Sequence, residues 1–271
     1  MSCSFCIPTK REKAFMKVED FEEIVKKIQG YTDLITLHVK GEPFMHPNLK
    51  ELLQICEKYK LKVNITTNAT LLSKQLQTII TSRAIRQINL SIHSIKQNGD
   101  NKLKEKEYVK QVIQSVRKIT QETPIIISYR LWNLESIKEN EHNKNILDIL
   151  EKEYQITNLL ERAKQEEYIK LDENVFLNQD EMFEWPTIER EIISKKGKCQ
   201  GLRNQIAILV DGSVVPCCLD QDGDIVLGNI LKDSLSSILE SDQVKRIKNG
   251  FENNILEEPL CQRCGYRKKF K

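Results

Sequence analysis

The 271-residue sequence has no long apolar run and little net charge, and both absences narrow the functions open to it. No stretch approaches the roughly 20 consecutive apolar residues that a membrane-spanning helix needs, and no secretory leader opens the chain. Lys and Arg number 42 against 39 Asp and Glu, for a net charge of +3. So small an excess does not indicate nucleic acid as a partner. We therefore expect a cytoplasmic protein that binds neither membrane nor nucleic acid.

Basic residues gather in one place only, at the C-terminal end. The run Tyr266-Arg267-Lys268-Lys269-Phe270-Lys271 holds four cations. Such a run is typical of a solvated tail, and we expect it to be one. The chain has no internal repeat and no low-complexity linker, so composition marks no sharp domain boundary.

Eight cysteines are the unusual feature of the composition. In a reducing compartment, close cysteine pairs indicate metal or redox chemistry rather than disulfides. Cys3 and Cys6 lie at the start, and Cys56 stands alone on the apolar face of an expected helix, where we expect a core residue. The other five crowd the last quarter: Cys199, Cys217, Cys218, Cys261 and Cys264. The distribution predicts two metal regions separated by a cysteine-poor scaffold.

Short apolar strands alternate with amphipathic helices over roughly the first half of the chain. We expect helices at Val18–Ile28, Pro47–Tyr59, Leu71–Ser82 and Leu103–Gln121. We expect strands at Leu34–Val39, Leu61–Thr66, Ile85–Ile92 and Ile125–Leu131. This alternation predicts βα units and a parallel sheet, whose chemistry lies at the C-terminal strand ends.

The pattern changes after Trp132. Residues 133–167 are highly charged and predicted to be a mostly helical insertion, Tyr168–Leu177 one further strand, and Thr187–Ser194 a helix. Asp211-Gly212 between two apolar runs predicts a β-hairpin. We place a domain boundary near residue 195, which gives a core over residues 1–195 and a small cysteine-rich α+β domain over residues 196–271.

Polar residues stand where the expected strands end. They are Gly41-Glu42-Pro43, Thr67-Asn68, Ser91 and Arg130, one group for each successive strand. Each alone has an ordinary interpretation: a turn at Gly41, a helix cap at Asn68, an ion-pair partner in Arg130. The Cys3-Ser4-Phe5-Cys6 pair alone is compatible with a thiol–disulfide pair, half a zinc site or part of an iron–sulfur loop. Their joint order favours one common site.

In this order the motifs resemble those of the radical S-adenosylmethionine (radical SAM) superfamily, over residues 3 to about 131. The resemblance implies a partial (β/α)6 barrel that lacks its first strand. It also implies a [4Fe–4S] cluster held by three thiolates, with S-adenosylmethionine bound at the open iron. One electron would split the cofactor into methionine and a 5′-deoxyadenosyl radical, which abstracts a substrate hydrogen, while the protein positions these groups.

The resemblance assigns the N-terminal cysteines to the family's Cys-x3-Cys-x2-Cys loop. Cys3 and Cys6 match its second and third cysteines, and Phe5 would pack near the adenine. The first cysteine would lie four residues before Cys3, which is two residues before Met1. We expect Met1 to be an internal methionine of a longer chain; the competing interpretation is a protein that has lost this cluster.

The resemblance also implies roles at the strand ends. Glu42 would bind the methionine ammonium through a charge-assisted contact, with Gly41 allowing close backbone approach and Pro43 fixing the turn. Three further residues would contact the ribose, the methionyl part or the methionine carboxylate: Asn68, Ser91 and Arg130.

The C-terminal cysteines resemble the SPASM and twitch extensions found behind many radical SAM cores. The full SPASM pattern needs seven cysteines and two clusters, so five cysteines imply a single auxiliary [4Fe–4S] cluster. The implied ligands are Cys199, Cys217, Cys261 and Cys264, with Cys218 as the spare or the substitute for Cys217. A zinc site built from the same thiolates is the alternative.

Taken together, the resemblance implies a radical SAM oxidoreductase or modifying enzyme. Its substrate would be a peptide, favoured by analogy alone, or another small molecule. A flavodoxin or ferredoxin would donate the electron. The alternative is a non-catalytic protein derived from such enzymes that binds an iron–sulfur cluster or zinc.

Overall fold

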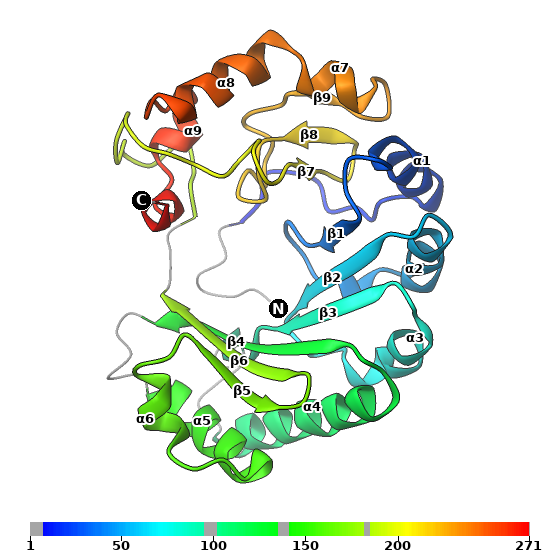
Figure 1. Cartoon of the computed structure of the whole chain (residues 1–271), viewed down its shortest axis with the longest axis vertical. Coiled ribbons are helices and arrows are strands. Elements are labelled where there is room, and N and C mark those ends of the chain that lie inside the picture. The colour runs from blue at the N-terminus through cyan, green and yellow to red at the C-terminus, as the bar shows by residue number, and fades with distance from the viewer. Residues whose placement is uncertain (1–7, 95–101, 135–140, 182–184, 271) are drawn as a thin grey trace. The chain divides into compact units, whose positions relative to one another are not determined.

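The computed structural model describes residues 8–94, 102–134, 141–181 and 185–270 (Figure 1). Among these residues the chain forms two compact units. The first contains residues 33–38 and 42–181, and the second contains residues 8–32, 39–41 and 185–270.

A six-stranded sheet forms the centre of the first unit, in the order β1-β2-β3-β4-β6-β5 (Figure 1). Its strands are β1 (Leu34–Leu37), β2 (Lys62–Thr67), β3 (Ile85–Leu90), β4 (Ile126–Leu134), β5 (Tyr168–Asp172) and β6 (Val175–Glu181). All neighbours pair in parallel except β5, which runs antiparallel to β6. The expected α/β class with a parallel sheet is confirmed.

One face of this sheet supplies the apolar core. The unit's helices are η1 (Pro43–Met45), α2 (Leu49–Lys58), η2 (Ser73–Gln75), α3 (Leu76–Thr81), α4 (Lys102–Glu122), α5 (Glu141–Tyr154) and α6 (Leu159–Ala163). Ile65, Ile88 and Tyr129 are fully buried, and the Tyr129 hydroxyl lies 2.9 Å from that of Tyr154 on α5. Cys56 on α2 is also fully buried, as expected for a core residue.

The opposite face of β2 and β3 carries polar side chains. Gln87 Nε2 donates to Asn89 Oδ1 at 2.7 Å, and Asn89 Nδ2 donates to Thr66 Oγ1 at 3.2 Å. Asn64 precedes Thr66 by two residues and therefore shares its face. Parallel strands are usually apolar on both faces. Here one face builds the core, and the other presents amides and hydroxyls.

The sequence predicted one strand over Tyr168–Leu177, and this was wrong. The segment is a hairpin of β5 and β6, whose turn includes Asn174 with a left-handed φ of +86°. Asparagine tolerates that conformation better than most residues, and that tolerance permits the tight reversal.

The second unit contains an antiparallel sheet of β7 (Ala207–Ile208), β8 (Ser213–Val215) and β9 (Gly228–Asn229). Its helices are α1 (Val18–Ile28), α7 (Leu235–Leu239), α8 (Asp242–Glu252), α9 (Pro259–Gln262) and η4 (Tyr266–Lys269). Strands β7 and β8 form the expected hairpin, with Gly212 at a φ of +82° in its turn.

The helix expected over Thr187–Ser194 is wrong, because residues 185–194 contain no helix. The backbone N–H groups of Ile193 and Ser194 instead donate to the carbonyl oxygen of Gln262, at 2.9 and 3.1 Å. The isoleucines that suggested a buried helical face are exposed, Ile192 by 45%. Pairing with a distant segment therefore overrides the local apolar pattern.

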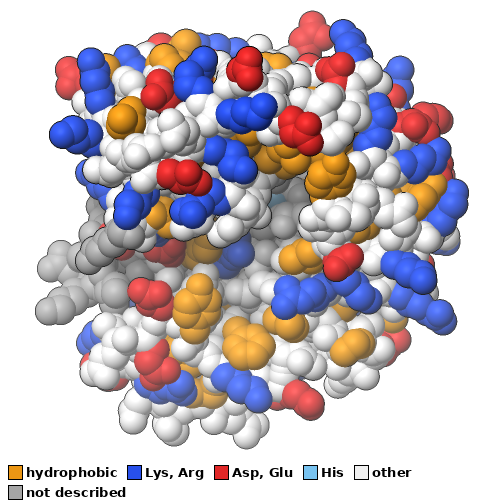
Figure 2. Space-filling model, turned by 45° about the horizontal axis from the view of Figure 1, so that its top comes forward, with side chains coloured by type: hydrophobic (Ala, Val, Ile, Leu, Met, Phe, Trp, Pro, Cys, Tyr) orange, Lys and Arg blue, Asp and Glu red, His pale blue; other side chains and the backbone are white. Residues whose placement is uncertain are grey.

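No helix in the described ranges is long and apolar enough to cross a membrane. On the face drawn in Figure 2, Lys and Arg side chains are interspersed with Asp and Glu, which agrees with the near balance of charges in the sequence.

Candidate functional site

Glu42 ties the loop after β1 to the end of β2. Its Oε1 accepts hydrogen bonds from Phe44 N at 3.1 Å and from Thr67 Oγ1 at 2.7 Å, and its Oε2 accepts one from Asn68 N at 2.8 Å. A carboxylate offers about four lone-pair sites. Glu42 therefore holds two loops together and keeps acceptor capacity on Oε2 for a cationic ligand.

The residues on either side of Glu42 shape this loop. Gly41 has a φ of +105°, and no atom lies within 4 Å of the position that a Cβ would take there. Glycine is thus required by the backbone conformation and not by crowding. Pro43 opens the short helix η1, where a proline needs no N–H partner.

Asn68 turns the chain at the end of β2. Its Oδ1 accepts a hydrogen bond from Thr70 N at 3.0 Å, and its carbonyl oxygen accepts one from the Tyr108 hydroxyl at 2.5 Å. The side-chain bond to the backbone two residues on is an Asx turn. Tyr108, on α4, was not singled out from the sequence, because its partner lies 40 positions away.

Ser91 joins the same group of strand ends. Its N–H donates to the carbonyl oxygen of Thr67 at 2.8 Å, and its own carbonyl oxygen accepts a bond from Ser94 Oγ at 2.7 Å. Thr67 thus contacts Glu42 through its hydroxyl and Ser91 through its backbone. The structure brings Glu42, Asn68 and Ser91 to neighbouring strand ends, as the sequence predicted.

Arg130 on β4 takes part in a different set of contacts. Its guanidinium carbon lies 4.3 Å from the centre of the Trp132 ring, a cation–π arrangement. The indole Nε1 of Trp132 donates to Asn178 Oδ1 at 2.6 Å. His93 Nδ1 lies 2.9 Å from the carbonyl oxygen of Arg130. The guanidinium thus lies over the indole ring at a distance typical of a cation–π contact.

The N-terminal cysteines and their neighbour lie outside the described residues. They are Cys3, Phe5 and Cys6, so their predicted roles stay predictions.

Five half-buried thiols occur in the second unit. Gly201 packs between two of them, because a Cβ there would lie 3.6 Å from Cys199 Sγ and 3.8 Å from Cys217 Cβ. Cys261 lies on α9, and Cys264 N donates to the Cys261 carbonyl oxygen at 3.3 Å. Close packing at Gly201 and the tight Cys261–Cys264 turn preorganise the thiols.

The electrostatics of the thiols place four of them in one neighbourhood. Burial, with smaller contributions from Cys218, Cys199 and Cys264, raises the pKa of Cys217 to about 12. Burial also raises the pKa of Cys261, and Cys217, Cys199 and Cys264 contribute to that rise. The pKa of Cys218 is raised by burial and, among the other cysteines, by Cys199. Cys261 thus shares its surroundings with Cys217, which favours Cys217 over Cys218 as a ligand.

The donor set suits an iron–sulfur cluster. Within the described part of the chain, no three His, Cys, Asp or Glu side chains converge closely enough to hold one metal ion. In a four-iron cluster each thiolate binds a different iron, so its sulfurs stand farther apart than those around a single zinc. The neighbouring thiols supply donors that either an iron–sulfur cluster or zinc would use.

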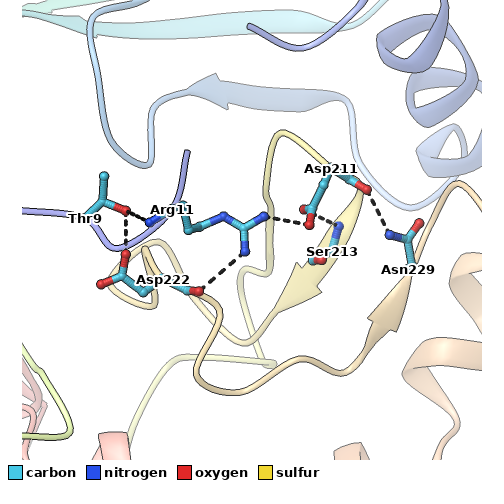
Figure 3. A network of polar contacts seen from close by, with 6 residues as sticks. All are labelled: Thr9, Arg11, Asp211, Ser213, Asp222 and Asn229. Carbon is cyan, nitrogen blue, oxygen red and sulfur yellow. Dashed lines mark hydrogen bonds and ion pairs between the residues drawn. The ribbon is translucent and has the colours of Figure 1, made fainter. Parts of the chain in front are cut away.

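A polar network holds the segment of residues 9–11 to the loops around the β7–β9 sheet of the second unit (Figure 3). Arg11 Nη2 lies 2.6 Å from Asp211 Oδ2 in the hairpin turn, and Arg11 Nη1 donates to the Asp222 carbonyl oxygen at 3.4 Å. Thr9 Oγ1 and Lys10 N both donate to Asp222 Oδ1, at 2.5 and 3.0 Å. These partners lie about 200 positions apart, so no local pattern could have identified them.

Two family models match the chain. The radical SAM superfamily model matches residues 1–144, and the iron–sulfur cluster-binding SPASM domain matches residues 199–265. A curated relative, GTP 3′,8-cyclase from Sulfurovum sp. (strain NBC37-1), is 26% identical over 159 residues. That alignment covers 55% of this chain and 46% of the relative, so the chain spans less than half of that protein.

Solved structures share the fold at low identity. BtrN in complex with AdoMet and 2-DOIA superposes with a TM-score of 0.60 at 16% identity, over 98% of this chain and 87% of that one. Streptococcus suis SuiB bound to precursor peptide SuiA superposes with a TM-score of 0.56 at 16% identity, over 98% of this chain and 67% of SuiB. The protein anSMEcpe with bound AdoMet and Cp18Cys peptide superposes with a TM-score of 0.58 at 16% identity, over 96% of this chain and 83% of anSMEcpe. The expected fold and cysteine-rich extension are confirmed.

Proposed function

The chain belongs to the radical SAM superfamily and carries an iron–sulfur cluster-binding domain, and we propose that it is a modifying oxidoreductase whose substrate is a peptide. The observation that supports a working cofactor site is the Glu42 carboxylate, held by Thr67 and Asn68 where two parallel strands end. When bound, the N-terminal cluster and S-adenosylmethionine supply a one-electron cleavage and a hydrogen-abstracting radical. The residues described below bind and orient the reactants.

Glu42 binds the ammonium of the cofactor's methionine in this proposal. Among the described residues, its Oε2 accepts one hydrogen bond, from Asn68 N, and a lone pair remains for an N⁺–H donor. Gly41, with its positive φ, and Pro43, at the start of η1, set the conformation of the loop that carries this carboxylate. Asn68 and Ser91, tied to the same strand ends, contact the ribose or methionyl part.

Arg130 pairs with the methionine carboxylate in this proposal, because its planar guanidinium matches the geometry of a carboxylate. The N-terminal loop completes the cofactor site, with Phe5 against the adenine and with Cys3 and Cys6 as cluster ligands.

The auxiliary cluster is assigned to Cys199, Cys217, Cys261 and Cys264. Their closeness in the second unit and the SPASM match support this ligand set. We place the start of this domain near residue 195. One cluster is the most that the five cysteines of this region hold when each iron–sulfur cluster takes four thiolates.

A peptide is the favoured substrate, because two structures of similar fold hold peptides, SuiA in one and Cp18Cys in the other. BtrN, which holds 2-DOIA, supports a small molecule as the second candidate. An electron donor of the flavodoxin or ferredoxin type and a cytoplasmic location complete the proposal. The competing assignment is a non-catalytic cluster-binding protein.

The test uses the protein reconstituted with iron and sulfide without oxygen. With dithionite and S-adenosylmethionine it should release 5′-deoxyadenosine, and deuterium from a labelled peptide substrate should appear in that product. Iron uptake without any 5′-deoxyadenosine would support the non-catalytic assignment.

Two variants separate a ligand role of Glu42 from its structural role. Glu42→Ala should weaken S-adenosylmethionine binding at least about tenfold, as expected for the loss of a hydrogen bond to a charged group. Thr67→Val removes a donor to Glu42 but keeps the carboxylate, so it should leave binding nearly unchanged. Iron content should be the same in both variants. Equal losses of binding in both would show that Glu42 is only a structural clamp.

A further inference from the structure

Positive charge is concentrated in the two segments that carry three of the candidate cluster ligands. Residues 194–204 and 259–271 contain nine basic residues and no Asp or Glu. They are Lys195, Lys196, Lys198, Arg203, Arg263, Arg267, Lys268, Lys269 and Lys271. The remaining 247 residues hold 33 Lys and Arg against 39 Asp and Glu. A chain that is slightly basic overall is therefore acidic outside these segments and strongly basic within them.

The two basic segments pack against each other. Arg267 Nη1 donates to the Lys196 carbonyl oxygen at 3.1 Å, and Ser194 N donates to the Gln262 carbonyl oxygen at 3.1 Å. A Cβ at Gly197 would lie 2.5 Å from Arg267 Nη1, so the guanidinium rests on this glycine. The described side chains of both segments, up to residue 270, consequently form one surface, which we call the basic surface.

Several cations of the basic surface are open to solvent, and the four named next form no ion pair with any described residue. Lys195, Lys196, Lys198 and Lys268 are exposed. The closest acidic residue along the chain, Glu258, directs its Oε1 to Arg246 Nη2 of α8, at 2.8 Å. The Glu258 carboxylate therefore pairs with Arg246 and not with a lysine of the basic surface.

The basic surface borders the candidate cluster site and lies beside exposed apolar groups. Cys199 lies in its first segment, and Cys261 and Cys264 lie in its second. Two isoleucines lie beside these segments and not within them: Ile193 and Ile255 are 39% and 47% exposed, and Ile255 forms a β-bridge with Lys196. Apolar side chains among uncompensated charges are typical of a transient protein interface.

We propose that the basic surface is the docking site of an acidic one-electron carrier protein that reduces the C-terminal cluster. This rests on the proposed function, because only a redox enzyme needs such a carrier. In the step, the reduced carrier loses one electron and is oxidised, and the C-terminal cluster gains that electron; no bond is broken and no proton moves. Opposite charge speeds such encounters, and docking beside the ligand-bearing segments keeps the transfer distance short.

Single-stranded nucleic acid suits this surface less well than an acidic protein. Bases bind by stacking on free aromatic rings among basic residues. Here the Tyr266 ring packs edge-on against Phe270, with centres 5.6 Å apart, and Lys269 Nζ lies 5.2 Å from the Tyr266 ring centre. These aromatic rings are occupied by each other and by a lysine.

The test measures binding of a purified flavodoxin, which is acidic, to the 271-residue chain reconstituted without oxygen. The charge-reversal pair Lys195→Glu/Lys268→Glu should weaken binding about tenfold or more at low salt, and the loss should shrink as salt rises. The control pair Lys118→Glu/Lys170→Glu changes the net charge equally at exposed sites of the first unit, and should leave binding within about twofold of wild type.

A second measurement separates docking from the cluster itself. Reduced flavodoxin should bleach the C-terminal cluster more slowly in the charge-reversal pair, whereas dithionite should bleach wild type and variant equally. If both pairs weaken flavodoxin binding equally, or if neither does, the docking site is wrong. Tighter binding of a single-stranded oligonucleotide than of flavodoxin, lost in the same pair, would also overturn it. A cluster that dithionite cannot reduce would instead count against the proposed function.

Discussion

The two units build their candidate sites from contacts of very different range along the chain. In the first unit Glu42 reaches Thr67 and Asn68, which are 25 and 26 positions away, and parallel strands hold all three. In the second unit Thr9 reaches Asp222 across 213 positions, and most of the cysteines lie in loops and a one-turn helix. Regular strands keep a site in place without a ligand, whereas loops that enclose a ligand gain much of their stability from binding it.

Because of this difference, we expect bound cofactors to stabilise the second unit more than the first. Cluster binding to preorganised thiols contributes directly to the folding free energy of a small domain. The first unit has a large apolar core beneath its strand ends, so its fold should not depend on cofactor binding. The predictions below test this contrast, beginning with the largest expected effect.

Cys261→Ser or Cys264→Ser should abolish the C-terminal cluster, because each removes one of four thiolates and serine is a poor ligand for iron in this setting. Iron content and visible absorbance after anaerobic reconstitution measure the loss. Cys56→Ser is the matched control, since Cys56 is fully buried on α2 of the first unit. Zinc uptake with refusal of iron in the wild type would end the cluster assignment.

Cys217→Ser should likewise lose the cluster, while Cys218→Ser should keep most of it. The reason is that Cys217 shares its surroundings with Cys261 and Cys264, as the shifts in their pKa values indicate. The pair is well matched because the residues are adjacent and both half-buried. If Cys217→Ser keeps the cluster and Cys218→Ser loses it, Cys218 is the ligand instead of Cys217.

Ile88→Ala should destabilise the first unit by about 2–5 kcal/mol, the usual cost of truncating a fully buried isoleucine. Urea unfolding measures the change. Because the cysteines lie in the other unit, the iron content of the C-terminal cluster should stay at the wild-type value. A parallel fall in iron would show that the two units fold as one, contrary to the contrast drawn above.

Gly212→Ala should cost about 1–3 kcal/mol, because alanine is strained at a φ of +82°. Its Cβ would also lie 2.7 Å from Leu231 Cγ. Gly30→Ala supplies the control, with a similar φ of +88° but no atom within 4 Å of the added Cβ. Thermal unfolding should show a smaller loss of stability for Gly30→Ala than for Gly212→Ala. Equal losses would mean that backbone strain alone determines the effect.

The sequence predicts the first unit better than the second for the same physical reason. Helix α2 (Leu49–Lys58) and strand β3 (Ile85–Leu90) follow from periodicity, which depends on neighbours a few residues apart. The strand-end motifs were found because the ends of parallel strands converge wherever the sheet forms. The network of Arg11 with Asp211 and Asp222 has no such local signature, because each partner is recognisable only once the chain has folded.

The errors have the same origin. Residues 187–194 carry isoleucines at helical spacing, yet their backbone N–H groups bond to Gln262, almost 70 positions away. The β5–β6 reversal at Asn174 depends on one residue's tolerance for a left-handed conformation, which a window average does not show. The basic run at the C-terminal end looked like a tail, but it includes the short helix η4, whose Arg267 bonds to Lys196.

The two-faced sheet of the first unit has an evolutionary consequence. Ile65, Ile88 and Tyr129 on its apolar face bear most of the packing energy of these strands. Gln87, Asn89 and Thr66 on the other face bond mainly to one another. Substitutions on the polar face can therefore accumulate at little cost to folding. The polar face of one scaffold can therefore change its chemistry by single substitutions. The fold need not first become more stable.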